Sequence, residues 1–174
     1  MIGLRRRTVK LVDFDPEWTV LAGAACLALQ NEAGDLFVET QHVGSTAIPG
    51  LPAKPVLDLA AAVLTFDVLP DLIPRLASMG YCYRGHRAET GGHLFIVESA
   101  PDVRTIHLHV VLGGSKQWRG YLAFRDALRR RVDLRLRYAE LKIALAALHS
   151  DDTASYTAGK AAFIQEVLIG GIGD

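Results

Sequence analysis

The sequence predicts an α+β fold in which a mixed β-sheet packs on helices and the C-terminal third is helical. Short apolar strands are interspersed with helices up to about residue 115, whereas the pattern from Gln117 onward is helical to the end. The chain has 174 residues, 50% of them hydrophobic, which suits one compact globular unit. We therefore expect a single domain over residues 1–174, with the sheet in about 1–115 and the helices in about 116–174.

The N-terminal elements are predicted from helix caps and apolar runs. Asp15-Pro16-Glu17 is a typical helix start, so we expect a helix over Trp18–Glu32 that stops at Gly34. Three segments are expected next: a strand from Phe37 to Val43, a turn or very short helix over Thr46–Lys54, and a buried strand over Pro55–Val63 that carries one carboxylate.

A second helix and three more strands complete the predicted sheet region. The helix covers Asp67–Met79 and stops at Gly80. The strands cover Tyr81–Arg84, Leu94–Glu98 and Thr105–Leu112, with Gly91-Gly92 as a turn between the first two. The last strand alternates, so we expect one face to carry Thr105, His107, His109 and Val111, and the other Ile106, Leu108 and Val110.

The helical third is strongly basic although the whole chain is neutral. Breaks are expected near Asp133 and at Ser150–Asp152, where acidic residues cap the last helix. The chain has 19 basic and 19 acidic residues, but the segment from Lys116 to Lys142 holds nine basic residues against three acidic ones. This pattern is typical of a solvated helix face or of a local phosphate partner, and the solvated face is the commoner case.

Composition excludes several classes of protein. The two cysteines, Cys26 and Cys82, lack zinc-site spacing and are expected to be small core hydrophobes. No apolar run is long enough to span a bilayer, and no apolar signal core follows the basic N-terminus, so we expect a soluble cytoplasmic protein without a membrane partner. Nucleic acid is an improbable partner because the basic residues are not interleaved with aromatic ones. The residues expected in the core include Trp18, Trp118, Phe124 and Phe163.

A glycine–serine turn followed by a buried aspartate is the most informative motif. Gly44-Ser45 ends one predicted strand, and Asp58 lies on the next. Glycine lets backbone amides approach a phosphate closely, and the serine hydroxyl can add a hydrogen bond. A carboxylate on a buried strand is costly unless it is paired or holds a cation. The motif therefore indicates a binding site for a metal-bound polyphosphate. His42 lies at the entry to the turn and is expected to support it.

Two histidines extend this candidate site. His107 and His109 share one strand face, so their imidazoles can converge on one point. Together with Asp58 they would form a two-histidine, one-carboxylate set, which suits zinc, manganese or iron. The alternative is a pair of half-buried histidines hydrogen-bonded to the helical layer.

The stretch from His42 to Ala60, including Lys54-Pro55-Val56-Leu57-Asp58, resembles the signature of the GrpB family, which belongs by fold to the nucleotidyltransferase superfamily. The resemblance runs from about Val12 to Val167 in the family's order. Its other pieces are Asp15-Pro16-Glu17-Trp18, Arg104 to Val111, Trp118 with Phe124-Arg125-Asp126, Tyr138 to Lys142, and Tyr156 with Lys160 and Phe163. The resemblance implies a nucleotidyltransferase-like sheet, and it includes fusions with a dephospho-CoA kinase.

The sequence departs from these patterns at four places. The superfamily places two carboxylates two residues apart on one strand, but here Asp58 is followed by Ala60. Gln41 stands where GrpB proteins usually have a glutamate, and the first histidine of the strand that holds His107 and His109 is lost. The segment Gly85–Gly92 lacks the family's usual loop. One carboxylate is a small set for holding a magnesium pair.

The resemblance implies an enzyme that moves a nucleotidyl group from a nucleoside triphosphate to an unknown acceptor, a protein or a metabolite. Asp58, His107 and His109 would be catalytic and would hold a divalent metal, magnesium or manganese, with zinc possible through the histidines. Binding of the substrate would fall to Gly44, Ser45, Thr46, Lys54, Arg125, Lys142, Tyr156 and Lys160. The alternative is a non-catalytic module that binds a nucleotide or another anionic metabolite and lacks the second carboxylate.

Overall fold

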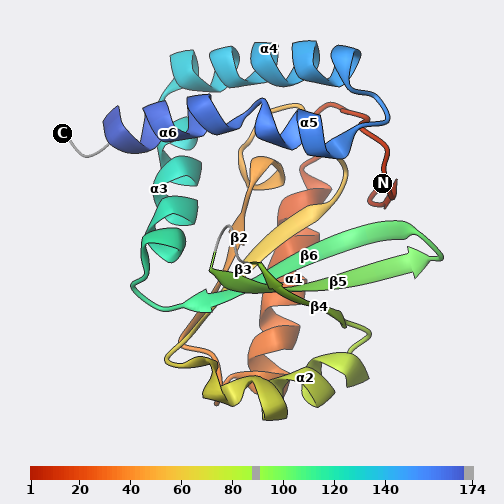
Figure 1. Ribbon diagram of the computed structural model, residues 1–174, viewed down its shortest axis with the longest axis vertical. Coiled ribbons are helices and arrows are strands. Elements are labelled where there is room, and N and C mark those ends of the chain that lie inside the picture. The colour runs from red at the N-terminus through yellow and green to blue at the C-terminus, as the bar shows by residue number, and fades with distance from the viewer. Residues whose placement is uncertain (88–90, 171–174) are drawn as a thin grey trace.

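A six-stranded mixed sheet forms the centre of the protein (Figure 1). The computed structural model describes residues 1–87 and 91–170. The strands are β1 (Leu4–Arg5), β2 (Glu39–Val43), β3 (Leu57–Val63), β4 (Cys82–Arg87), β5 (Gly92–Ala100) and β6 (Val103–Leu112). Their order is β2-β3-β6-β5-β4, and β1 pairs with β6. Only β3 and β6 are parallel, and the other pairs are antiparallel.

Two groups of helices lie on opposite sides of this sheet (Figure 1). One group comprises α1 (Glu17–Ala33) and α2 (Leu69–Ser78), which follows a short 3₁₀ turn at Phe66–Val68. The other comprises α3 (Lys116–Arg130), α4 (Val132–Leu148), α5 (Thr153–Ala158) and α6 (Ala161–Gly170). Helix α3 stands beside β6, and α4, α5 and α6 lie across one end of the sheet (Figure 1). We call these four helices the helical layer.

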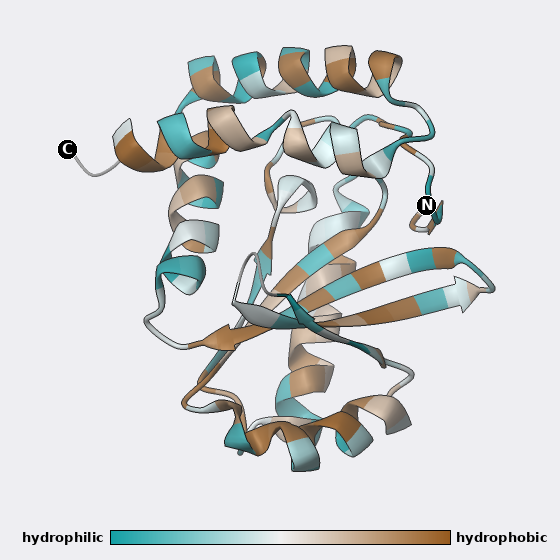
Figure 2. Ribbon diagram, viewed as in Figure 1, coloured by the Kyte–Doolittle hydropathy of each residue, from teal (hydrophilic) through white to brown (hydrophobic). Residues whose placement is uncertain are grey.

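The main hydrophobic core lies between the sheet and α1 with α2. From β3 it takes Leu59, Ala61 and Val63, and from β6 it takes Leu108 and Val110. Because side chains alternate along a strand, the residues between them face the other way, toward the helical layer. In Figure 2, brown and teal segments alternate along the middle of β6, as this two-residue period predicts, whereas most of β5 is brown.

The helical layer has a smaller core of its own. Ile48 and Leu51, from the loop between β2 and β3, pack there with residues of α3, α4 and α6. Tyr138 stacks on Phe163 in this cluster, with ring centroids 5.1 Å apart. The loop after β2 is therefore anchored in the helices, which fixes the distance between the helical layer and the ends of β2 and β3.

The predicted α+β fold with its mixed sheet is confirmed, and so are the expected faces of β6. Asp15 accepts a hydrogen bond from the Glu17 N–H at 3.0 Å, and Asp152 caps α5 through the N–H groups of Ala154 and Ser155. In the part of the chain that the structure describes, no helix is long and apolar enough to cross a membrane.

Some expectations at the level of single elements were wrong. Strand β1 was not anticipated, because its two residues are too few to show a pattern. The last helix divides at Gly159 into α5 and α6. Cys82 is exposed rather than buried, because β4 is an edge strand whose residues mostly face solvent. Gly91 forms the expected turn, but Gly92 already begins β5, and residues 88–90 of the atypical segment Gly85–Gly92 lie outside the described residues.

Candidate functional site

The site is centred on Asp58, which lies on β3 opposite His107 of the parallel strand β6. The Oδ1 atom of Asp58 is 3.4 Å from His107 Nδ1 and 3.6 Å from His109 Nε2. Pairing of His109 with Ala60 places the second imidazole two residues farther along the same face. The structure therefore brings the three predicted residues together through strand register alone.

The carboxyl group of Asp58 stays ionised. Burial opposes its charge, but interactions with His107 and His109 outweigh burial and hold the pKa of Asp58 well below its ordinary value. The side chains of these three residues keep 33%, 22% and 26% of their surface exposed, so a ligand can reach the group.

The Gly44-Ser45 turn passes directly over Asp58. Gly44 has φ of +69°, and a Cβ added there would lie 2.6 Å from Asp58 Oδ2. Only glycine permits both this backbone conformation and this close approach. The 3₁₀ turn Ser45–Ala47 follows, and Thr46 Oγ1 lies 2.9 Å from His42 Nε2. The prediction that His42 braces the turn is confirmed, and burial lowers the pKa of His42 to about 4.

Two lysines face the same centre from different segments. Lys54 Nζ lies 5.5 Å from the centroid of the buried Tyr156 ring, and Lys160 Nζ lies 4.5 Å from it. Within residues 1–87 and 91–170 neither lysine forms an ion pair. Burial lowers the pKa of both, that of Lys160 to about 8, while the charge of Asp58 acts in the opposite direction. A bound anion would restore the favourable environment that these ammonium groups lack.

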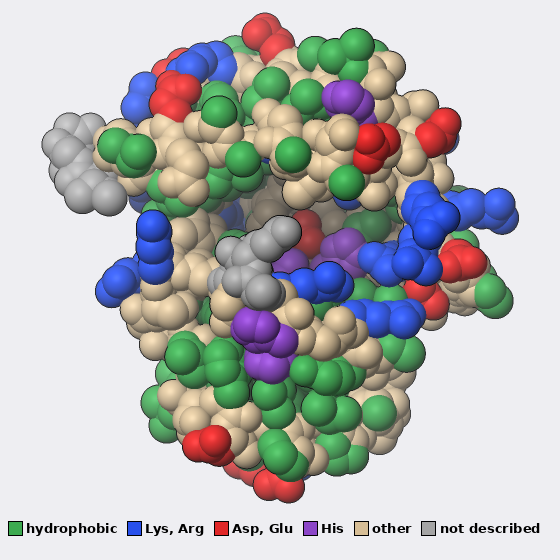
Figure 3. Space-filling model, in the orientation of Figure 1, with side chains coloured by type: hydrophobic (Ala, Val, Ile, Leu, Met, Phe, Trp, Pro, Cys, Tyr) green, Lys and Arg blue, Asp and Glu red, His purple; other side chains and the backbone are tan. Residues whose placement is uncertain are grey.

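These side chains line a cavity of about 240 Å³ that adjoins a larger one. Ser45, Asp58 and Lys160 line both. The larger cavity, about 520 Å³, lies against α3 and α6 and presents Tyr121 and Phe124. Figure 3 shows the hollow between the helical layer and the sheet, with histidine and acidic side chains at its bottom. We call the two the central cavity and the aromatic cavity.

Two predicted substrate-binding residues are held away from these cavities. Arg125 is buried on α3 and donates to Gln41 Oε1 at 2.7 Å and to the His42 carbonyl at 3.0 Å. Lys142 is 1% exposed and donates to the Pro52 carbonyl. Neither side chain lines the central or the aromatic cavity. Arg125 joins α3 to β2, and Lys142 joins α4 to the loop between β2 and β3.

The donor atoms do not fit a pair of magnesium ions. Ala60 occupies the place where a second carboxylate would stand, and it is fully buried in an apolar cluster with Val43, Val111 and Trp118. Across residues 1–87 and 91–170, no group of three or more histidine, cysteine or acidic side chains is arranged to hold a metal ion. The predicted metal site is thus present as neighbouring side chains but not as a formed coordination sphere.

Reasoning from the sequence missed the aromatic side chains of the aromatic cavity and also a third cavity. Tyr121, whose ring centroid is 5.4 Å from that of His109, was not singled out, and Phe124, which packs against the helical core as expected, is half-buried and also lines the aromatic cavity. The third cavity, about 870 Å³, is lined by the N-terminal arginines Arg5, Arg6 and Arg7. Their run in the sequence was the available signal.

Comparison with solved structures defines the class of fold. A poly(U) polymerase named Cid1, described with bound Mg 3′-dATP, superposes over 86% of this chain and 49% of its own, with a TM-score of 0.57 at 14% identity. The protein therefore has a nucleotidyltransferase-like fold. The GrpB protein from Enterococcus faecalis superposes over 94% of this chain and 97% of its own, with a TM-score of 0.83 at 27% identity.

The chain belongs to the GrpB family, because the model of the GrpB protein matches residues 8–169. A UPF0157 protein of Halalkalibacterium halodurans is 30% identical over 92% of this chain and 81% of its own length. A dephospho-CoA kinase of Mycolicibacterium paratuberculosis is 28% identical over 90% of this chain, which covers 44% of that protein. The predicted family is thus confirmed.

Proposed function

We propose that the protein binds a nucleoside triphosphate between the sheet and the helical layer and transfers its nucleotidyl group to an acceptor. The observation that carries this is the position of Asp58 under the Gly44-Ser45 turn, at the junction of two cavities and facing Lys54 and Lys160. Backbone amides at a glycine turn and unpaired ammonium groups are typical partners of a polyphosphate.

The aromatic cavity suits the nucleoside. Tyr121 and Phe124 offer ring faces on which a base can stack. Gln117 and Gln165 offer amide groups that can form hydrogen bonds with the edge of that base. A nucleoside there directs its phosphates toward Ser45, Lys54 and Lys160 in the central cavity. The structure of Cid1, which shares this fold, is described with bound Mg 3′-dATP, and this supports a nucleotide as the ligand.

Asp58 and His107 would remove a proton from the acceptor. With Nδ1 of His107 protonated and facing Asp58, its Nε2 carries a lone pair, and that atom has no hydrogen-bond partner in the part of the chain that is described. The acceptor hydroxyl gives its proton to Nε2 while its oxygen bonds to the α-phosphorus. The bond from that phosphorus to the bridging oxygen breaks, and Lys54 and Lys160 neutralise the departing pyrophosphate.

A divalent cation, magnesium or manganese, remains part of the proposal, with zinc as a second choice through His109. The donors available to one ion are the Asp58 carboxylate and the His109 imidazole, because His107 accepts the proton of the acceptor. Such an ion would neutralise phosphate charge when bound.

A second candidate is a non-catalytic nucleotide-binding module, and Ala60 favours it. The apolar cluster around Ala60 leaves no polar environment for a second carboxylate at this position. Such a module would keep the cavities and their lysines and would act beside a partner enzyme. The kinase relative, in which a segment similar to this chain is less than half of the protein, supports an accessory role.

Melting temperature with each nucleoside triphosphate, with and without Mg²⁺ or Mn²⁺, tests nucleotide binding. A ligand at 100 times its Kd stabilises the folded state by about 2.7 kcal/mol, which shifts melting by several degrees. We expect a shift that is lost in Lys160→Gln and kept in Arg130→Gln, an exposed arginine on α3 outside these cavities. Release of pyrophosphate then separates the enzyme from the module. No shift with any nucleotide would contradict both.

A further inference from the structure

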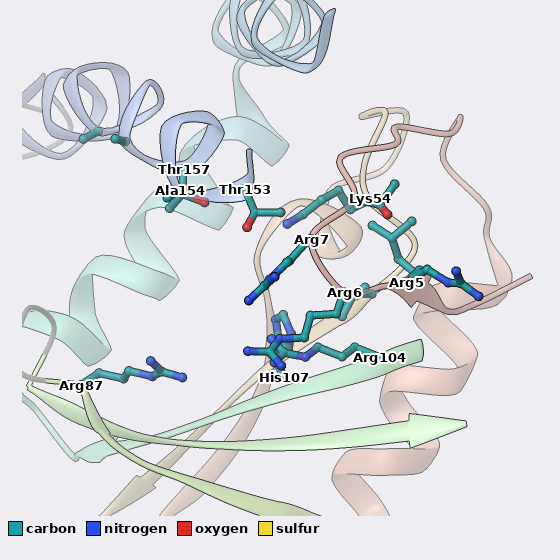
Figure 4. Close-up of a pocket in the computed structure, with 15 residues that line it drawn as sticks. Arg5, Arg6, Arg7, Lys54, Arg87, Arg104, His107, Thr153, Ala154 and Thr157 are labelled. Carbon is teal, nitrogen blue, oxygen red and sulfur yellow. The ribbon is translucent and has the colours of Figure 1, made fainter. Parts of the chain in front are cut away.

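A cationic cleft adjoins the central cavity on the side away from the aromatic cavity. It has a volume of about 870 Å³ and lies between β1, β6 and the start of α5. Figure 4 shows that its cations come from four separate segments and extend toward one space, whereas Arg5 extends away from it. We call it the arginine cleft. The side chains that define it are Arg6, Arg7, Lys54, Arg87, Arg104 and His107.

Its positive charge is not neutralised from within. None of the lining residues in the described ranges 1–87 and 91–170 is acidic. Glu98 lies 3.9 Å from Arg104 Nε and 3.8 Å from Arg84 Nη2, outside the lining. Burial lowers the pKa of Arg104, and the charges of Arg6, Arg84 and Arg87 lower it further while Glu98 raises it. Like charges held this close indicate a place for an anionic ligand.

Two buried nitrogen atoms on this wall lack hydrogen-bond partners. They are Arg104 Nε and His107 Nε2. Neither forms a hydrogen bond among the described residues, but Arg104 Nε has Glu98 at 3.9 Å, outside the lining. Buried polar atoms in folded proteins are nearly always satisfied, so the unpartnered nitrogen of His107, a residue that lines the cleft, indicates a missing ligand. A phosphate oxygen would accept from Arg104, and a hydroxyl would donate to His107.

The arginine cleft opens onto the proposed reaction centre. Lys54, Val56, His107 and Thr157 line both this cleft and the central cavity. The nucleoside is assigned to the aromatic cavity, on the other side of Asp58. His107 lines both the cleft and the central cavity, so a molecule in the cleft is placed to present its hydroxyl to His107.

We infer that the arginine cleft binds the acceptor, and that the acceptor is a small molecule carrying phosphate as well as a free hydroxyl. This inference rests on the proposed nucleotidyl transfer. The hydroxyl of the acceptor lies toward His107, and the phosphate of the acceptor lies among Arg6, Arg7 and Arg104. The cleft has the size of a metabolite site. Its described lining includes no phenylalanine, tyrosine or tryptophan on which RNA bases could stack, which favours a small acceptor over RNA.

Calorimetric titration with inorganic pyrophosphate, at saturating ATP so that the nucleotide site is filled, tests the inference. We expect the Arg6→Gln, Arg7→Gln double variant to weaken pyrophosphate binding by about tenfold or more, because it removes two charge-assisted contacts. Both side chains are exposed, so the fold is retained. Arg130→Gln is the matched control. Equal affinity in the double variant and the wild type would overturn the inference, as would no binding at all.

Two further measurements keep this inference distinct from the proposed function. Pyrophosphate is also titrated without ATP into Lys160→Gln, where we expect binding that still depends on Arg6 and Arg7. If ATP fails to bind to the wild type while this dependence holds, the anion site stands and its role as an acceptor site is overturned. A ten-residue oligouridine that binds more tightly than pyrophosphate, with the same dependence on the arginines, would overturn the assignment to a small acceptor.

Discussion

The two faces of β3 and β6 differ sharply although the same strands form both. One face carries Leu59 and Leu108, which are fully buried against α1 and α2. The other carries Asp58 and His107, which remain partly exposed between the sheet and the helical layer. Parallel pairing aligns Leu59 with Leu108 and Asp58 with His107, so one register sets both faces. The difference shows that neighbouring residues on one strand can serve different purposes, one stabilising the core and the next lining the candidate site.

Helices cover both faces, but they cover them differently. On the apolar face α1 and α2 exclude water and contribute hydrophobic side chains. On the polar face the helical layer stands apart and encloses cavities lined by Lys54 and Lys160. Substitutions on the two faces should therefore affect different measurements.

Asp58→Asn should produce the largest effect, a loss of nucleotidyl transfer of about a thousandfold or more. The amide cannot stabilise a protonated His107, and misplacement of one preorganised electrostatic group costs on this scale. Pyrophosphate release under saturating nucleotide is the measurement. Asp71→Asn, an exposed acid on α2, should be fully active. An active Asp58→Asn protein would remove Asp58 from the mechanism.

Leu108→Ala should lower the free energy of unfolding by about 3 kcal/mol, because it leaves a cavity in a fully buried position. Denaturant titration measures this. His107→Ala, one residue away on the same strand, should cost about 1 kcal/mol, because its side chain is partly exposed. Equal losses from the two variants would show that the two faces contribute equally to stability.

Gly44→Ala should cost about 2 kcal/mol and also weaken nucleotide binding. The new Cβ meets Asp58 Oδ2, and a positive φ is strained for alanine. Gly50→Ala is a useful control, since it has a positive φ of 76° but an added Cβ meets nothing within 4 Å. Melting with and without ATP compares the two. Equal loss of binding would mean that strain, rather than the approach to Asp58, matters.

Lys142→Met should flatten the pH dependence of stability. Burial lowers the pKa of Lys142 to about 7, with contributions from Lys160 and Lys54. Between pH 7 and the ordinary lysine pKa, the unfolded chain binds a proton that the folded chain lacks, so stability rises with pH. We expect the difference between wild type and variant to grow by about 1 kcal/mol per pH unit from pH 7.5 to 9.5.

Urea titrations at four pH values would measure this smallest effect. Taking the difference between the two proteins cancels the titration of tyrosines and cysteines common to both. A constant difference across the range would show that Lys142 keeps its charge in the core, held by its bond to the Pro52 carbonyl.

Part of the site could be predicted because it depends on local pattern. Alternation along residues 105–112 placed His107 and His109 on one face, and the order of the motif placed Asp58 nearby. The cap at Asp15 and the break at Asp152 follow from short-range hydrogen bonds. Family resemblance supplied the fold class, which the neighbouring structures share.

Other parts depend on contacts between residues far apart in the chain. Lys142 meets Pro52 across 90 positions, and Arg125 meets Gln41 across 84. A basic residue in a helix can be solvated, can bridge two segments or can face a ligand. The residue type is the same in all three cases, so the sequence alone does not distinguish them. The packing partner decides between these roles, because it sets burial and the available acceptors.

The sequence by itself determined most of the helices and strands, the alternation along β6 and the glycine–serine turn ahead of Asp58. Only the tertiary structure decided that Ala60 lies in an apolar cluster, that Arg125 joins a helix to β2 and Lys142 joins a helix to a loop, and that the N-terminal arginines form a cleft. The pairing of Leu4 with Arg104 creates that cleft across a hundred residues of chain. Local periodicity specifies which face a side chain occupies, whereas its neighbours are set by how the faces pack together.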